Sequence, residues 1–294
     1  MTRQDRGPVR RVDGVAQDRA ELGAFLRSRR DRLTPAQAGI EPFPGPRRVP
    51  GLRKEELAVL AGLSPDYYSR LEQGRQPNIS TAVLDGLARA LRLTEVEHAH
   101  LVDLAQPTAR RRATTVVPVQ RADPGLLRLM SALDHLPVLL LGQRTDVLAS
   151  NTLFSAVQRE LAPGSSLARF LFLDPLARER IVNWSFFASN TVATLRREAA
   201  RRPQDGKLKA LIDELRAADP DVARWWDDHQ VRDHASVSKL IRHPVGGDLS
   251  FDIEIVSAPQ EPDQQLIIYT VQPDSPTAKV LPLLASWHRD ARVP

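Results

Sequence analysis

Residues 53–74 read RKEELAVLAGLSPDYYSRLEQG, and this stretch decides the fold of the first part of the chain. Two short helical patterns, Glu55–Leu60 and Pro65–Leu71, are separated by only four residues. One of the four is Gly62, which can adopt the positive φ that a tight turn between helices requires. Ser64-Pro65 is typical of a helix start, because a capping side chain precedes proline at the first helical position. The stretch therefore predicts two helices joined by a tight turn.

The apolar residues of this stretch are spaced so that each helix buries one side against the other. The positions that pack are Ala58, Leu60, Leu63, Tyr68 and Leu71. The second helix then exposes Pro65, Asp66, Tyr67, Ser69 and Arg70. Polar side chains on such a helix can read base edges in the major groove of DNA. The pattern favours a helix-turn-helix, with two core helices of an ordinary bundle as the alternative.

Helical patterns continue on both sides of this turn. We expect helices at Glu21–Leu33, Leu52–Leu63, Pro65–Gln73, Thr81–Leu93 and Glu95–Ala105. Thr34-Pro35 should cap a further turn, and the proline-rich segment 42–51 should be a loop. Residues 1–18 are charged and lack periodicity, so we expect a mobile arm there. Residues 19–106 are therefore predicted to form an all-α domain of five helices.

The basic charge of the chain is confined to this first part. The whole sequence has 294 residues and a net charge of +5. Residues 1–112 hold 20 lysines and arginines against 14 acidic residues, a balance of +6, so the remainder carries −1. A localised basic excess favours a polyanionic partner such as nucleic acid. A solvated surface with no such partner is the alternative interpretation.

The motif EELAxxAGLSxxYYSRLExG at 55–74 resembles the helix-turn-helix of XRE-type, phage-repressor-like transcription regulators. The resemblance covers residues 21–105 and implies double-stranded DNA as a partner. Carried over by position, it implies a DNA-binding set of Arg53, Lys54, Pro65, Asp66, Tyr67, Ser69, Arg70, Arg75 and Asn78.

Chemistry assigns different roles within this set. Arg70 is the best candidate for base reading, because a guanidinium can bind N7 and O6 of guanine together. Asp66 can only accept, from a cytosine or adenine amino group. Lys54 falls where the family contacts a phosphate, with help from a helix N-terminus. For Glu72 the resemblance implies an internal salt bridge.

The second part of the chain has a different pattern. Apolar runs at 137–144 and 145–150 predict a hairpin. Further strands are expected at 231–243, 247–258 and 264–272. Helices are expected at 152–161, 175–202, 207–217, 220–229 and 275–287. In the strand 247–258, apolar and polar residues alternate, so one face should be buried and the other wet. A hairpin, several helices and three strands on one antiparallel sheet is an α+β layout.

Short motifs in this second part occur in a recognisable order. They are LASN (148–151), FLFLDP (170–175), LRREAA (195–200), LIDEL (211–215) and LSFDIEIV (249–256). Together they resemble the MmyB-type ligand-binding domain, a PAS-like sheet with a helical cover. The chain departs from relatives at Asp219, Val222 and Val237-Ser238-Lys239. The identity of a ligand therefore does not carry over.

A PAS-like fold encloses apolar space between sheet and helices, which suits a hydrophobic small molecule or an acyl chain as effector. For each aromatic residue, a place in a filled core is the alternative. Asn151 could contact ligand or cap the helix that starts at Thr152. The candidate ligand-binding residues are Leu148, Asn151, Phe154, Phe170, Phe172, Trp184, Phe187, Trp226, His243 and Tyr269.

Composition excludes several other classes of protein. The sequence has no cysteine, which excludes disulfides and thiol chemistry. No apolar run of about 18 residues is present, and the charged start is not a secretory signal, so we expect a cytoplasmic protein without membrane insertion. No catalytic or metal-ligand motif is found, and we expect no catalytic residue, metal or cofactor. His98 and His100 are two apart on a helix and diverge.

These features predict a cytoplasmic regulator of transcription and not an enzyme. Residues 107–122 should be a linker, and residues 123–294 a PAS-like ligand-binding and dimerisation domain. One helix-turn-helix buries too little surface for tight specific binding, so we expect a homodimer. The alternative function is a regulator whose second domain binds no ligand and serves only dimerisation or docking of a protein partner.

Overall fold

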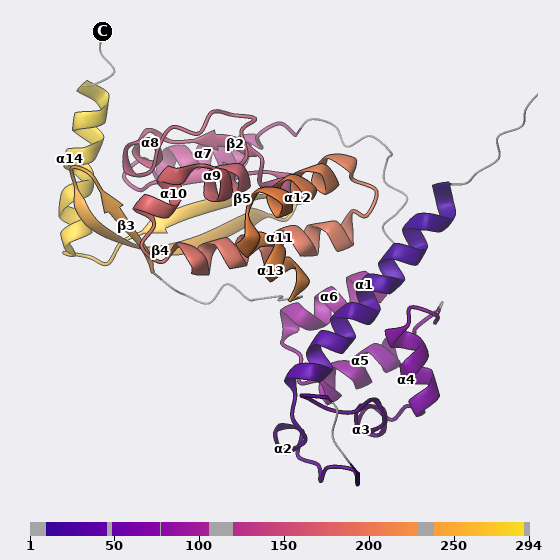
Figure 1. Cartoon of the computed structure of the whole chain (residues 1–294). Helices are drawn as coiled ribbons and strands as arrows, with labels where there is room; N and C mark the ends of the chain where they lie inside the picture. Colours follow the sequence, from indigo (N-terminus) through magenta and orange to yellow (C-terminus); the bar gives the residue numbers. More distant parts are fainter. Residues whose placement is uncertain (1–9, 46–48, 77, 106–119, 229–237, 291–294) are drawn as a thin grey trace, which may run out of the picture. The chain divides into compact units, whose positions relative to one another are not determined.

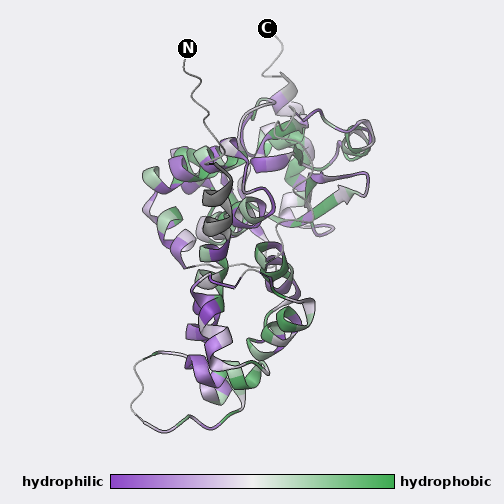
Figure 2. Ribbon diagram, turned by 90° about the vertical axis from the view of Figure 1, so that its right-hand side faces the viewer, coloured by the Kyte–Doolittle hydropathy of each residue, from purple (hydrophilic) through white to green (hydrophobic). Residues whose placement is uncertain are grey.

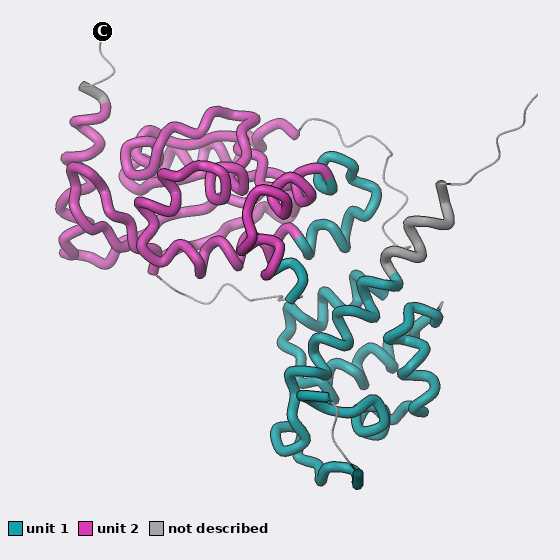
Figure 3. The backbone as a smooth tube through the Cα atoms, in the orientation of Figure 1, with its two compact units in different colours: residues 1–116, 196–209, 225–232 teal, residues 117–195, 210–224, 233–294 magenta. Residues whose placement is uncertain are grey.

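The computed structural model describes residues 10–45, 49–76, 78–105, 120–228 and 238–290. Contacts within the chain define two compact units (Figure 3). Unit 1 comprises residues 1–116, 196–209 and 225–232. Unit 2 comprises residues 117–195, 210–224 and 233–294.

The described residues up to 105 form the helices of the first part of unit 1 (Figure 1). They are α1 (Arg10–Arg32), α2 (Pro35–Ala38), α3 (Lys54–Leu60), α4 (Pro65–Glu72), α5 (Thr81–Ala90) and α6 (Glu95–Ala105). The five helices predicted from the sequence are all present. The turn expected after Thr34 is the short helix α2, where the side chains of Thr34 and Gln37 cap each other's backbone amides.

Helix α1 begins earlier than predicted. The sequence pattern placed its start at Glu21, whereas the structure is helical from Arg10. Apolar periodicity shows only the part of a helix that packs against a core. Beyond that part a helix can extend at a small cost in free energy through residues such as Arg, Ala and Gln. Residues 10–18 are therefore helical rather than part of an arm, and the rest of the predicted arm, residues 1–9, lies outside the described residues.

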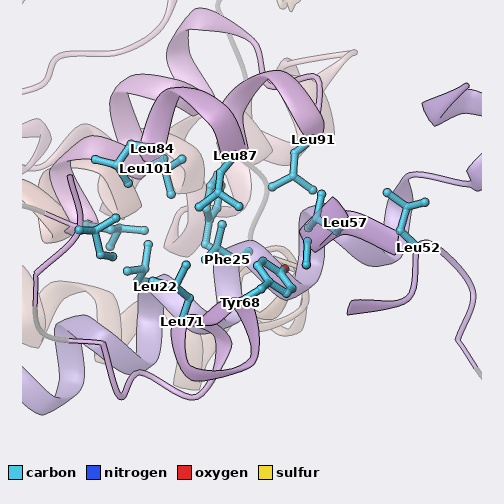
Figure 4. Packing of buried hydrophobic residues seen from close by; sticks show 14 of the residues in the cluster. Leu22, Phe25, Leu52, Leu57, Tyr68, Leu71, Leu84, Leu87, Leu91 and Leu101 are labelled. Atoms are coloured by element: carbon cyan, nitrogen blue, oxygen red, sulfur yellow. The ribbon is translucent and has the colours of Figure 1, made fainter. Parts of the chain in front are cut away.

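The core of unit 1 is aliphatic, with one phenylalanine and one tyrosine at its centre (Figure 4). Leu22, Phe25 and Leu26 of α1 meet side chains from α3, α4, α5 and α6. Gly23 brings two backbones together, since a Cβ there would lie 2.2 Å from the carbonyl oxygen of Glu72. The close approach fixes α1 against the end of α4.

Unit 2 is built around a five-stranded antiparallel sheet in the order β2-β1-β5-β4-β3. Its strands are β1 (Val138–Leu141), β2 (Val147–Ser150), β3 (Lys239–His243), β4 (Gly247–Ala258) and β5 (Glu261–Thr270). The helices before β3 are α7 (Pro124–Ala132), α8 (Thr152–Val157), α9 (Leu167–Leu173), α10 (Pro175–Arg180), α11 (Trp184–Arg201), α12 (Gly206–Ala218) and α13 (Pro220–Asp227). The end of α11, the start of α12 and the end of α13 belong to unit 1. Helix α14 (Pro276–Asp290) follows β5. The α+β, PAS-like fold expected for this part is confirmed.

The two faces of the sheet are covered by different elements. Alternate residues of a strand point to opposite faces. Leu126 of α7 packs with Leu140, Leu266 and Ile268 on one face. Tyr269, the neighbour of Ile268, points to the other face and contacts Phe154 of α8. We call this second side, the one that Tyr269 shares with Phe154, the inner face.

Several elements differ from the sequence expectation. The helix predicted over 175–202 is split into α10 and α11, because Ile181 is extended and bridges to Ile241 of β3. Helices α7 and α9 were not predicted. Asp123 caps α7 with Pro124 behind it, a start signal that the sequence does carry. The strand predicted from 231 begins at Lys239, and residues 229–237 lie outside the described part.

Hydrophilic residues interrupt the hydrophobic ones along the helices (Figure 2). Within the described residues, none of the helices combines the length and the hydropathy needed to cross a membrane.

Candidate DNA-binding face and ligand-binding domain

The turn between α3 and α4 has the geometry that the sequence predicts. Gly62 adopts φ +68°, in the left-handed region. Leu63 N donates to the carbonyl of Ala58 at 2.8 Å. Ser64 caps α4 by accepting a hydrogen bond from Tyr67 N at 3.2 Å. These bonds hold α4 at a fixed angle to α3, so its exposed side is presented by a defined turn.

The buried and exposed sides of this pair of helices follow the predicted pattern. Ala58, Tyr68 and Leu71 are buried, and Leu60 and Leu63 are partly buried. The exposed or partly exposed residues on and after α4 are Pro65, Asp66, Tyr67, Ser69, Arg70, Arg75 and Asn78. Tyr67 also packs against the core of unit 1, whereas the other candidates on α4 are on its free side, and Arg75 and Asn78 follow the helix.

An ion pair runs along the exposed side of α4. Arg70 Nη1 lies 2.7 Å from Asp66 Oδ2, one helical turn earlier, and both side chains are exposed. On the same helix, Gln73 Nε2 donates to Ser69 Oγ at 3.2 Å. Both side chains remain exposed, so the Arg70 guanidinium is accessible from solvent.

The two basic residues at the start of α3 have different partners. Arg53, the residue before α3, donates to the carbonyls of Pro44 and Gly45 at 2.9 and 2.7 Å. It therefore holds the base of the proline-rich loop. Lys54, the first residue of α3, keeps about a third of its side chain exposed. Its ammonium lies 3.4 Å from the Glu72 carboxylate, which is its partner in the structure.

Glu72 is the electrostatic centre of unit 1. Its buried carboxylate accepts hydrogen bonds from Arg30 Nε at 2.6 Å and Tyr68 Oη at 2.7 Å. Lys54 Nζ lies 3.4 Å away and Arg27 Nε 3.8 Å away. Burial alone would raise the pKa of Glu72, but the bonds from Arg30 and Tyr68 and the nearby cations outweigh burial and lower it. The internal salt bridge expected for Glu72 is present.

On the inner face of the sheet in unit 2, aromatic rings gather around Tyr269. The ring of Phe154 lies 5.7 Å from that of Tyr269, and the ring of Phe251 of β4 lies 5.5 Å from it. Lys239 Nζ donates to Tyr269 Oη at 2.9 Å and sits 5.1 Å from the ring centres of Tyr269 and Phe187. Three predicted ligand-binding residues, Phe154, Phe187 and Tyr269, are therefore brought together.

Two other candidates form a separate pair among the helices. The rings of Phe172 and Trp184 pack edge to face at 6.0 Å. The guanidinium of Arg178 stacks 3.6 Å from the Trp184 ring, and Trp184 Nε1 donates to the carbonyl of Leu171. Phe170 lines a surface hollow of about 670 Å³ between the 159–166 segment and α9.

Comparison with known protein families matches these two regions separately. Residues 122–284, more than half of the chain, match the MmyB-like transcription regulator ligand binding domain. The chain belongs to this family. Residues 21–101 match a helix-turn-helix domain. A search of curated proteins gave no match. The MmyB-like chain thus joins a helix-turn-helix to the ligand-binding domain of a transcription regulator, and both matches are regulatory domains.

Two of the predicted ligand-binding residues of this MmyB-like regulator are not part of the Tyr269 group. Leu148 packs with Leu126 and Leu140 in the cluster under α7, on the opposite face of the sheet. An irregularity in the β1–β2 register between Leu140 and Leu141 accompanies this placement, which the alternation rule could not anticipate. Trp226 belongs to unit 1, where Arg196 stacks 4.5 Å from its ring.

Two further candidates bind the protein's own backbone. Asn151 caps α8 by accepting from Phe154 N at 2.9 Å, so the capping role that the sequence left open is present. It also bonds to β1 and to the carbonyl of Leu136. His243 Nδ1 accepts from two turn amides, and its Nε2 contacts the carbonyl of Ala156. Burial lowers the pKa of His243.

Sequence reasoning missed Lys239 and Arg30 as members of these groups. Lys239 could have been found, because in the strand Lys-Leu-Ile-Arg-His it shares one face with two other inward residues. Arg27, Arg29 and Arg32 lie close to Arg30 in the sequence and have the same chemistry. The sequence therefore does not indicate which of them pairs with Glu72.

Proposed function

We propose that the chain is an XRE-type, sequence-specific DNA-binding regulator that places α4 in the major groove. The observation that carries this proposal is the exposed side of α4, where Arg70 and Asp66 form an ion pair at 2.7 Å and both side chains are exposed. Arg70 then reads a guanine, and Lys54 binds a phosphate of the backbone.

We further infer that it acts as a homodimer on two half-sites. A single module of this kind buries too little surface for tight specific binding, and a two-fold dimer would space its half-sites about 34–36 Å apart or a multiple of that. Light scattering of the full chain, free and on DNA, tests the dimer. A monomer in both conditions would contradict it.

The C-terminal domain is proposed to sense a hydrophobic small molecule and to change the affinity for DNA. Its support is the set of aromatic rings on the inner face, Phe154, Phe187 and Tyr269, in a domain of the ligand-binding family. A ligand shifts DNA affinity only through its different affinity for the DNA-competent and incompetent states, typically about 1–3 kcal/mol.

One experiment tests both parts of this function. The full chain is used to select binding sites from random double-stranded DNA, and affinity for the selected site is compared with that for a scrambled site. Native mass spectrometry then looks for a co-purifying mass, and DNA affinity is measured again after stripping on a hydrophobic resin. Equal binding to both DNAs would overturn the DNA-reading function. A ligand-free protein whose DNA affinity is unchanged by stripping would favour the docking alternative.

A further inference from the structure

The ends of two helices of the ligand-binding family domain pack with the DNA-binding helices. Residues 196–201 of α11 and 225–228 at the end of α13 lie within the family match at 122–284 and outside the helix-turn-helix match at 21–101. Contacts nevertheless place both segments in unit 1 (Figure 3). We call these two segments the docking ends. Helices α11 and α13 therefore each start in unit 2 and finish in unit 1.

The docking end of α11 joins the core of the DNA-binding helices. Ala200 is 7% exposed and belongs to the buried cluster that contains Leu22 of α1 and Leu101 of α6. The next residue, Arg201, places its Nε 3.7 Å from Oδ2 of Asp103 in α6. A residue of the ligand-binding family domain thus completes the hydrophobic core of unit 1.

The docking end of α13 is bound by the last residue of α1. Arg32 Nη2 donates to the carbonyl oxygen of Asp228 at 2.8 Å and to its carboxylate at 2.9 Å. The guanidinium of Arg196 stacks 4.5 Å from the ring of Trp226, so the two docking ends also contact each other. They form one group that is attached to α1 and α6.

Helix α1 connects this group to α4. Gly23 of α1 lies against the backbone of Glu72, the last residue of α4, and Arg30 Nε donates to the Glu72 carboxylate at 2.6 Å. Close-packed interiors transmit displacements, because their side chains have little room to adjust. A shift of α1 is therefore passed to the helix that carries Arg70.

We propose that the docking ends carry regulation between the ligand-binding domain and the helix-turn-helix, and that the predicted linker 107–122 is not sufficient for it. The proposal deepens the regulatory function proposed above and rests on it. A change in unit 2 moves the starts of α11 and α13, and their docking ends then move α1. Coupling between two sites is reciprocal. DNA bound at α4 must therefore also change α11 where it belongs to unit 2.

Hydrogen exchange of the full chain, with and without a saturating amount of the selected duplex, tests this reciprocity without an effector. In the wild type, DNA should slow exchange of the amides of residues 188–195 in α11 by about 5-fold or more, the lower end of usual allosteric couplings. An exposed ion pair contributes little, so both docking pairs are reversed together in the variant Arg201→Asp/Asp228→Arg. This variant should lose the effect of DNA on α11.

Two further variants control the experiment. Adding Arg32→Asp and Asp103→Arg to the reversed variant restores opposite charges in both pairs, and it should restore the effect of DNA on α11. Asp134→Arg/Arg242→Asp makes the same two kinds of change at exposed residues of unit 2, and it should keep that effect. Asp228→Arg alone, rescued by Arg32→Asp, is the smaller form of the test and should show a partial loss.

The outcomes separate this route from DNA reading. If a bound duplex leaves exchange in α11 unchanged in the wild type, the route is wrong while DNA reading survives. If the reversed variant keeps the full effect, or if the control variant loses it equally, the docking ends are not the route. If anisotropy titration shows that the wild type binds no duplex, the DNA-reading function fails and the route fails with it.

Discussion

The two units of this regulator treat a buried charge in opposite ways. In unit 1, the Glu72 carboxylate has a hydrogen-bonded arginine, a tyrosine hydroxyl and two further cations within 4 Å. In unit 2, the Lys239 ammonium has a hydroxyl and two ring faces. A network in which every polar group has a hydrogen-bond partner stabilises one arrangement of helices. A network with unused donors can still form further hydrogen bonds. The contrast is between a buried charge with several polar partners and a buried charge with a single hydroxyl as its hydrogen-bond partner.

Removing the Glu72 carboxylate should have the largest effect. Glu72→Ala leaves Arg30 buried without its main partner, and breaking a buried pair costs about 3–5 kcal/mol. We expect the helical unit to unfold at lower temperature in calorimetry, with DNA binding lost. Glu55→Ala removes an exposed carboxylate of α3 and is the matched control. If both variants lose the same stability, the network is not the source.

Lowering the pH should weaken the same network. Because the pKa of Glu72 is lowered in the folded protein, the carboxylate adds stability that is present above its unfolded pKa, near 4.5. That stability is lost as the pH falls through the lower folded value. The free energy of unfolding, measured with urea, should fall between roughly pH 6 and pH 3 in the wild type. Glu72→Gln should lack this fall. An unchanged pH profile in Glu72→Gln would contradict the assignment.

The network also depends on the close approach of α1 and α4 at Gly23. A methyl group there would lie 2.2 Å from the Glu72 carbonyl oxygen. Gly23→Ala should therefore destabilise unit 1 by about 1–3 kcal/mol, although alanine favours helices. Gly206→Ala, at a site where an added Cβ meets open space, should be neutral or slightly stabilising. Thermal unfolding that ranks the two variants the other way would contradict this packing.

His243 sharpens the contrast inside unit 2, because it is a buried ionisable group whose ring nitrogens are both occupied. Nδ1 accepts from Val245 N and Gly246 N, at 3.2 and 2.8 Å, so the folded state favours neutral imidazole. Burial lowers its pKa, so the stability from His243 is present above about pH 6.5 and declines as the pH falls toward the folded value. His243→Asn keeps an acceptor for the turn and should remove this pH dependence from urea unfolding.

The exposed ion pair of Arg70 and Asp66 on α4 should contribute to DNA recognition and little to the stability of unit 1. Arg70→Ala should cost about 1–3 kcal/mol on the selected DNA site and relax discrimination at one base pair. Arg70→Lys keeps the charge but loses the two-donor fork, so it should lose discrimination while retaining binding to random DNA. Fluorescence anisotropy on selected and random duplexes measures both. Equal losses on the two DNAs would remove the base-reading role.

Lys54 should show the smallest effect on DNA recognition, because its proposed role there is one phosphate contact. Its ammonium also lies 3.4 Å from Glu72, so thermal unfolding of the variant is measured beside DNA binding. Lys54→Ala should weaken binding to all sequences similarly and reduce the salt slope by about one unit. Lys279→Ala, an equal loss of charge in unit 2, should leave the slope unchanged. A sequence-dependent loss in Lys54→Ala would indicate that this residue reads bases.

Local rules predicted the helix-turn-helix well because its determinants are local. Gly62, Ser64 and the spacing of buried leucines act within one turn or between neighbouring helices. For unit 2, the α+β fold class and the hairpins were predicted, but the helix boundaries and the face of some side chains were not. The break at Ile181 depends on pairing with Ile241, which is sixty residues away in the chain. The face of Leu148 depends on a register irregularity that alternation cannot show.

The hydrogen bonds at the β3 edge limit how copies of this protein can associate. Val182 N donates to the carbonyl of Leu240, and the Asn183 side chain bonds to Leu240 N and to the Ser238 carbonyl. At the other edge, Val147 exchanges backbone bonds with the 164–165 segment. Exposed sheet edges are templates for aggregation, and covered ones are not. A second chain cannot extend the sheet at these positions, so crowded copies should resist fibril growth through strand addition there.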